Sequence, residues 1–165
     1  ALVRARAIAG HARVIAGFER VRADVLVKAR DLSTFRADVL AMRARMRGEL
    51  DRSDALRVDL KQGGGGLVDL EFLLQERVLA LAANRPALLA PRDTPALIAT
   101  LAATGDFPAD EATRLHAAHE VLLLRSLDCT LDLRPRLCPP DGLLDAARAD
   151  ITAACAAHGL EFSAD

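Results

Sequence analysis

The chain lacks tryptophan and tyrosine, and phenylalanine occurs only five times among its 165 residues. Its core must therefore be built mainly from Leu, Ala and Val side chains. Leu, Ala and Arg dominate the sequence, and all three are good helix formers. Hydrophobic residues make up 52% of the chain, which excludes a disordered protein, and the length fits one domain with a substantial core. The composition favours an all-α fold.

Long apolar runs are also absent. No stretch approaches the roughly 18 residues that a membrane-spanning helix requires, and no secretory signal opens the sequence. Cysteine is scarce, and Cys129, Cys138 and Cys155 form no CxxC pair. We expect inert, partly buried and reduced thiols in a cytoplasmic protein that contacts no membrane. The first residue is Ala, which predicts either a piece of a longer chain or a processed N-terminus.

A large excess of charge is absent too, because the net charge is −1, but the charges are unevenly spread. Residues 1–50 hold 11 Lys/Arg and 5 Asp/Glu, a balance of +6, whereas residues 51–165 hold 11 and 18, a balance of −7. The basic part either meets an anionic partner or docks on the acidic part of its own fold. Its arginines are scattered and aromatic stacking residues are few, so we expect no nucleic-acid binding.

Two helical regions are predicted within the basic residues 1–50. Residues 2–27 are expected to form one helix or a pair of helices, bent at a glycine. Ser33 or Thr34 can cap a second helix that runs to about Arg47. Four apolar side chains of this second helix recur at helical spacing and are expected in the core: Phe35, Val39, Met42 and Met46.

The rest of the chain is predicted to form a bundle. A glycine-rich loop at 61–66 precedes a central helix at about 67–83, which is apolar on two sides. Further helices are expected at 94–103, opened by Thr94-Pro95, at about 108–133, and from a cap at Asp141 to His158-Gly159. No strand pattern of useful length occurs. The prediction is a single helical domain over 1–165 with five to six helices, the bundle proper occupying 67–160.

The four consecutive glycines Gly63 to Gly66 are the main candidate for a binding site. Backbone N–H groups at a helix start can hold a phosphate or carboxylate, and Lys61 adds a positive charge. However, neither GxxxxGK[ST] nor a strand-supported dinucleotide fingerprint is present. The alternative is that the glycines allow close packing of the loop on neighbouring helices.

Two acids follow the loop, but a regular helix separates Asp69 and Glu71 by about 200°, so they cannot chelate one ion as a pair. Glu71 and Gln75 fall between the two apolar faces, and a half-buried Glu71 needs a partner. We expect an arginine from the N-terminal helix, or backbone N–H groups. Asp69 lies in the first turn, where negative charge is favourable.

Other candidate residues give weaker signals. His116 and His119 are three residues apart with Glu120 beside them, but no third ligand is evident, so we expect surface histidines and no metal site. Arg4 and Arg6 can reach an anion, although solvated or ion-paired arginines are the more common outcome. No nucleophilic triad is present, and no catalytic residue is predicted.

Residues 61–75 read KQGGGGLVDLEFLLQ, which closely resembles a signature of the bacterial glutamine synthetase adenylyltransferase/adenylyl-removing enzymes, K-x-G-x-G-G-[IL]-x-D-[IL]-E-F-[LI]-x-Q. The opening ALVRARAIAG is similar to the A-L-x-R-A-R-x-x-A-G that follows the nucleotidyltransferase core in this family. Residues 94–125 also resemble the family. The positions that match the signature are Lys61, Gly63, Gly65, Gly66, Asp69, Glu71, Phe72 and Gln75.

The resemblance implies a parent enzyme with two halves, each a nucleotidyltransferase core followed by a helical domain. One half transfers AMP from ATP to a tyrosine of glutamine synthetase, and the other removes it. The removing half tends to read G-G-I-R-E-I-E-F, so Val68 and Asp69 make this chain resemble the adenylylating half. The family's metal-binding G-S-x-D-x-D motif is absent. Mg²⁺ and ATP are therefore expected to serve the parent enzyme, and this part alone is expected to be inactive and to bind no cofactor.

The resemblance further implies a regulatory and substrate-docking domain in nitrogen metabolism. Its expected partners are its own nucleotidyltransferase core, glutamine synthetase and a PII signal protein. Contacts to the nucleotide cleft would come from the signature residues, with Arg4 and Arg6. The corresponding domain of the removing half or of a PII uridylyltransferase is an alternative. A free-standing helical adaptor that only binds protein is an alternative of another class.

Overall fold

The computed structural model describes residues 2–162. Six α-helices and one 3-10 helix lie within them, together with a pair of two-residue strands, which confirms the all-α prediction. The predicted absence of strands was wrong only for that pair. In chain order the elements are α1 (Ala12–Leu26), α2 (Leu32–Leu50), β1 (Val58–Asp59), α3 (Leu67–Leu81), η1 (Pro86–Leu89), α4 (Thr94–Ala103), α5 (Ala109–Leu131), β2 (Leu137–Cys138) and α6 (Gly142–Ala157).

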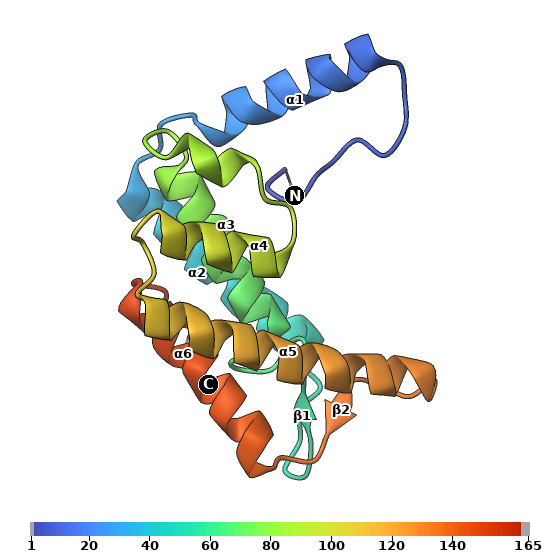
Figure 1. Ribbon diagram of the computed structural model, residues 1–165. Coiled ribbons are helices and arrows are strands. Elements are labelled where there is room, and N and C mark those ends of the chain that lie inside the picture. Colours follow the sequence, from blue (N-terminus) through green and yellow to red (C-terminus); the bar gives the residue numbers. More distant parts are fainter. Residues whose placement is uncertain (1, 163–165) are drawn as a thin grey trace.

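Helix α3 lies at the centre, as its two apolar sides predict, and it packs against α2, α4, α5 and α6. Helices α5 and α6 form an antiparallel hairpin on one side (Figure 1). Leu70, Leu73 and Val78 of α3 are completely buried. They join aliphatic side chains of the neighbouring helices in one core, which includes Leu97, Ile98, Leu101, Leu115, Leu122, Leu144 and Ile151.

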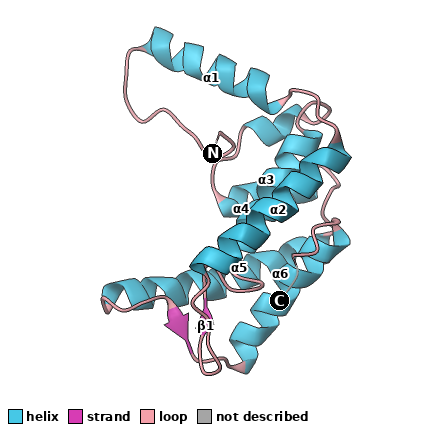
Figure 2. Ribbon diagram, turned by 180° about the vertical axis from the view of Figure 1, so that it is seen from behind, coloured by secondary structure: helices cyan, strands magenta, loops and turns pink. Residues whose placement is uncertain are grey.

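Most of helix α1 lies apart from this bundle and runs across one end of the molecule (Figure 2), while Leu26 at its end is buried in the core. The prediction of a helix over 2–27 was wrong for residues 2–11. Gly10 has a φ of 138°, which a helix does not allow, and the His11 side chain caps the helix by accepting a hydrogen bond from the Arg13 N–H. We call residues 2–26 the N-terminal arm. Ala1, the first residue of the opening motif, lies outside the described residues.

Aspartates begin three of the helices. Asp31 caps α2 and Asp93 caps α4, each one to three residues before the Ser33, Thr34 or Thr94 that sequence favoured. Asp141 caps α6 as predicted. A carboxylate at this position accepts backbone N–H groups and also faces the positive end of the helix, which a hydroxyl does less strongly.

The predicted core stripe on α2 is only partly confirmed: Val39 packs against the core, whereas Phe35, Met42 and Met46 are not part of it. Met42 is 49% exposed, and Phe35, Val39 and Met46 are only half-buried. The side chain that α2 does bury is Arg43, with no exposed area. Helix α2 therefore turns a charged residue fully inward and leaves most of its apolar stripe only partly covered.

The strands pair antiparallel, with Val58 opposite Cys138 and Asp59 opposite Leu137. They bring the segment before the glycine loop against the link between α5 and α6. Among the described residues, no helix is both long enough and apolar enough to cross a membrane.

Candidate functional site

The glycine loop is a tight turn between β1 and α3 that is held by its own backbone. Gly63 N–H donates to the Asp59 carbonyl, and Gly66 N–H donates to the Gly63 carbonyl, both at 3.0 Å. The Asp59 carboxylate accepts from the N–H groups of Lys61 and Gln62, each at 2.9 Å. The N–H groups of Leu67 and Val68 donate back to the carbonyls of Leu60 and Lys61. Many of the donors that a phosphate cradle would need are thus used within the chain.

The glycines differ in what they require. Gly65 has a φ of 66°, and a Cβ there would lie 2.3 Å from the Arg148 carbonyl oxygen of α6. At Gly66 a Cβ would lie 2.8 Å from the Gly63 carbonyl oxygen. At Gly64 it would meet only an Arg47 nitrogen at 4.0 Å. A Cβ at Gly63 would lie 2.6 Å from the Asp59 carbonyl oxygen, so the loop needs glycine at 63, 65 and 66 for close approach, while Gly64 has room for a side chain.

Asp69 fixes the loop to α2 and α3. Its carboxylate accepts from Arg43 Nε at 2.6 Å, from Arg47 Nη2 at 2.8 Å and from the Gly65 N–H at 2.7 Å. Arg43 also donates to the Gln62 carbonyl at 2.6 Å. Asp69 is 2% exposed. We call Asp69, Arg43, Arg47 and Gly65 the Asp69 clasp.

The clasp shows what the sequence interpretation missed. The sequence placed Asp69 in the first turn of α3 and expected burial and an arginine partner for Glu71. Of these two acids, Asp69 is the more deeply buried. Arg43 and Arg47 are four residues apart on α2 and so lie on one face of that helix. That spacing was the available signal, because two arginines on one helix face need an acid when the face is buried.

Glu71 points away from the clasp and pairs with Arg4. The predicted arginine partner is therefore confirmed, but it comes from the turn that precedes α1 and not from a helix. The side chains of Glu71 and Arg4 are 36% and 41% exposed. Asp69 and Glu71 thus hold different parts of the chain, as their angular separation predicts.

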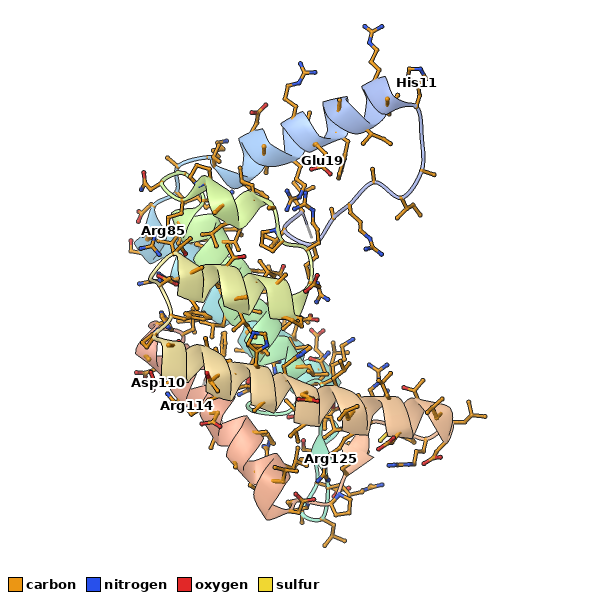
Figure 3. All side chains as sticks on the ribbon, in the orientation of Figure 1. His11, Glu19, Arg85, Asp110, Arg114 and Arg125 are labelled. Carbon is orange, nitrogen blue, oxygen red and sulfur yellow. The ribbon has the colours of Figure 1, made fainter. Side chains whose placement is uncertain are left out.

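A buried arginine, unforeseen from the sequence, holds the N-terminal arm. Arg22 is 1% exposed and donates to the carbonyls of Leu2, Val3 and Leu89 at 2.7–2.8 Å. Burial lowers the pKa of this guanidinium from its ordinary value. Glu19 points from α1 toward the bundle (Figure 3) and pairs with Arg92 at 2.9 Å.

The remaining predicted residues are spread over several surfaces. Lys61 is exposed and lines an open hollow of about 260 Å³ with Arg52 and Arg136. Arg4 and Arg6 are not among its lining residues. Gln75 lines a second hollow, of about 250 Å³, whose other residues are Phe35, Val39, Met42, Phe72, Glu76 and Leu79.

The histidine pair on α5 lies near the arm. Burial, followed by the charge of His116, lowers the pKa of His119 below its usual value. Arg4 lowers it further, whereas Glu71 raises it. Within residues 2–162, no group of three or more His, Cys, Asp or Glu side chains is placed to hold a metal ion.

Comparison with known sequences places these residues in a family. The pattern of the GlnD PII-uridylyltransferase family matches residues 33–136, more than half of the chain. The chain belongs to this family. The matched range starts in the first turn of α2 and contains the whole Asp69 clasp, but it leaves out the N-terminal arm.

Individual relatives in this family carry the name bifunctional glutamine synthetase adenylyltransferase/adenylyl-removing enzyme. One from Stenotrophomonas maltophilia (strain R551-3) is 58% identical over 163 residues, which cover 99% of this chain and 18% of the relative. One from Xanthomonas axonopodis pv. citri is 55% identical over 162 residues, or 98% of the chain and 17% of the relative. One from Nitrosococcus oceani is 43% identical over 119 residues, or 72% and 12%. These names confirm the resemblance, and the chain spans less than a fifth of the length of these relatives.

Proposed function

We propose that this chain is the helical domain that follows the nucleotidyltransferase core in the adenylylating half of a glutamine synthetase adenylyltransferase. The identity of 53–58% to relatives of that name over most of the chain supports this assignment. In the parent enzyme the core would bind ATP and Mg²⁺ and transfer AMP to a tyrosine of glutamine synthetase. The helical domain would act in the cytoplasm as a regulatory and docking module.

The Asp69 clasp is the observation that carries this role. The signature residues Gly65, Gly66 and Asp69 are committed to contacts within the domain. The sequence also lacks G-S-x-D-x-D. Signature residues that hold a loop against three helices are better suited to a rigid support for the neighbouring core than to a catalytic role. The core, glutamine synthetase and a PII signal protein are the partners that this proposal implies.

Lys61 is the signature side chain best placed to reach outside the domain. It follows β1 and faces the open hollow beside Arg52 and Arg136, so three cations line one surface, against a single carboxylate, Asp59. Such a surface suits an anionic group of the core or of its nucleotide. In this proposal Lys61 and its neighbours complete the nucleotide cleft, while Asp69 keeps them in place.

The test uses the full-length parent enzyme with Lys61→Ala. We expect AMP incorporation into glutamine synthetase to fall by at least about tenfold, the effect of losing ~1.4 kcal/mol of charge interaction, with an unchanged unfolding midpoint. Lys28→Ala, the one other lysine of the chain and an exposed one, is the matched control and should leave activity unchanged. Full activity of the Lys61→Ala enzyme would contradict the role of Lys61 in the cleft.

A second candidate is the same domain in a PII uridylyltransferase, which the name of the matched family favours. The parent would then transfer UMP to PII and not AMP to glutamine synthetase. Assaying the parent with both nucleotides and both protein substrates separates the two. The removing half is disfavoured by Val68, which is 4% exposed and leaves little room for the arginine of that half.

A further inference from the structure

Two cysteines that the proposed function does not use lie against each other. Cys129 is in α5 and Cys138 is in β2, and their Sγ atoms are 3.7 Å apart. A disulfide has an S–S length of about 2.05 Å, so closing the pair requires a shift of roughly 1.7 Å. The third cysteine, Cys155, contacts the backbone oxygen of Asp69 instead, at 3.8 Å.

The two sulfurs differ in their surroundings. Cys138 keeps 6% of its surface exposed, and the Nη1 atom of Arg134 lies 4.0 Å from its Sγ. Cys129 has no exposed surface, and burial raises the pKa of its thiol. Cys138 is therefore the sulfur that meets an oxidant first, and Cys129 is the sulfur beside it that can resolve the product.

The turn between the two cysteines can absorb the movement. Leu133 is 95% exposed and has a φ of 54°, a left-handed conformation that is unfavourable for a side chain of this type. The Arg134 N–H donates to the Cys129 carbonyl at 2.9 Å, so this turn also holds the guanidinium beside the pair. The sulfurs are thus joined by a surface segment and not locked between two rigid helices.

We propose that Cys129 and Cys138 form a redox-active pair that a hydroperoxide closes to an intramolecular disulfide. The Cys138 thiol gives up its proton as its sulfur attacks one peroxide oxygen, the O–O bond breaks, and the leaving hydroxide takes up a proton, so that a sulfenic acid and one water form. The Cys129 sulfur then attacks the Cys138 sulfur, its proton leaves with the hydroxyl group as a second water, and the S–S bond forms. Two thiols and one hydrogen peroxide give one disulfide and two waters.

This bond would act on the glycine loop through the strand pair. The Arg136 carbonyl, two residues before Cys138, accepts a hydrogen bond from the Leu60 N–H at 3.0 Å. Leu60 directly precedes the loop, and Val58 pairs with Cys138 itself. A disulfide between β2 and α5 therefore fixes the position of β2, against which β1 and the start of the loop at Lys61 pack. Oxidation would in this way restrain the loop.

The test treats the reduced chain with hydrogen peroxide and measures intact mass and the number of thiols that an alkylating reagent labels after unfolding. We expect a mass lower by two hydrogen atoms, one labelled thiol in place of three, and reversal by dithiothreitol. Cys155→Ser should still form the bond. Three labelled thiols at full oxidant exposure, or a bond that includes Cys155, would overturn the proposal.

Single-cysteine variants test which of the two sulfurs reacts first, and hydrogen exchange tests whether the disulfide affects the glycine loop. Cys129→Ser should trap a sulfenic acid at Cys138, detected as one dimedone adduct per chain, whereas Cys138→Ser should leave Cys129 unmodified. In the oxidised wild-type chain the Leu60 amide should exchange on the order of tenfold more slowly. An adduct on Cys129 would refute the attacking role of Cys138. Unchanged exchange at Leu60 would refute the coupling of the disulfide to the loop.

Discussion

The glycine loop and the N-terminal arm are attached to the bundle by opposite arrangements. In the loop, a buried carboxylate, Asp69, is surrounded by two guanidinium groups and a backbone N–H. In the arm, a buried guanidinium, Arg22, is surrounded by three backbone carbonyls. The first arrangement joins two helices of the bundle, while the second joins the start of the chain to η1 and α1. Removing Asp69 therefore leaves the buried Arg43 without its carboxylate inside the bundle, whereas removing Arg22 releases a segment at the edge of the bundle.

The largest effect is expected for Asp69→Ala. It leaves Arg43 and Arg47 near the bundle without their carboxylate, which costs about 3–5 kcal/mol in the free energy of unfolding. Urea unfolding followed by circular dichroism measures this loss. Asp69→Asn keeps the shape of the side chain and one acceptor oxygen. Its free energy of unfolding should lie between that of the wild-type chain and that of Asp69→Ala. A loss below about 1 kcal/mol would show that the clasp does not stabilise the bundle.

Gly65→Ala tests the same region without removing a charge. The left-handed φ and the contact with the Arg148 carbonyl together should cost about 2–4 kcal/mol. Gly64→Ala is the matched control one residue away, and its thermal unfolding midpoint should be unchanged or slightly raised. Equal destabilisation by both substitutions would mean that the loop does not have the described conformation.

Arg22→Met should have a smaller and more local effect. It removes three hydrogen bonds that the ionised guanidinium donates. The loss lowers the stability of the arm by about 2–3 kcal/mol and has little effect on the rest of the bundle. Among the described helices, α1 has no extensive packing against another helix. Amide exchange in residues 2–26 should therefore accelerate about 30- to 150-fold, with a nearly unchanged urea midpoint for the bundle. Arg20→Met, at an exposed position of α1, is the control, and global unfolding by Arg22→Met would erase the contrast between the two regions.

Glu71→Gln should have the smallest effect. The pair with Arg4 is more than a third exposed on both sides, so its loss costs about 0–1 kcal/mol in thermal denaturation. Glu71 lies two residues after Asp69, and Glu71→Gln removes one negative charge just as Asp69→Asn does. A cost as large as that of Asp69→Asn would show that exposure does not decide the strength of these two ion pairs.

The sequence predicted most of the helices because their signals are local. Apolar periodicity, prolines and caps predict α3, α4, α5 and α6 to within about two residues, and the pairing of Glu71 with an arginine follows from its place between two apolar faces. Residues 2–11 were misread because a helical composition was given more weight than Gly10, whose φ of 138° ends any helix there.

Tertiary partners were harder to predict. Whether Phe35, Val39 and Met42 or the adjacent arginine face of α2 turns inward depends on Asp69, which lies 26 residues beyond Arg43. Arg22 gave no sequence signal, because its acceptors are backbone carbonyls that any residue supplies. The proximity of Cys129 and Cys138 likewise depends on a turn with a left-handed leucine that no pattern marks.

The two-residue strand pair also bears on the order in which this chain acquires its structure. The α5–α6 hairpin and the clasp between α2 and α3 join residues that are near in sequence and can form early, since closing a short loop costs little entropy. Val58 and Cys138 are 80 positions apart, from 138 minus 58. Their pairing closes a much longer loop than the clasp does, so we expect the strand pair beside the glycine loop to form after the clasp.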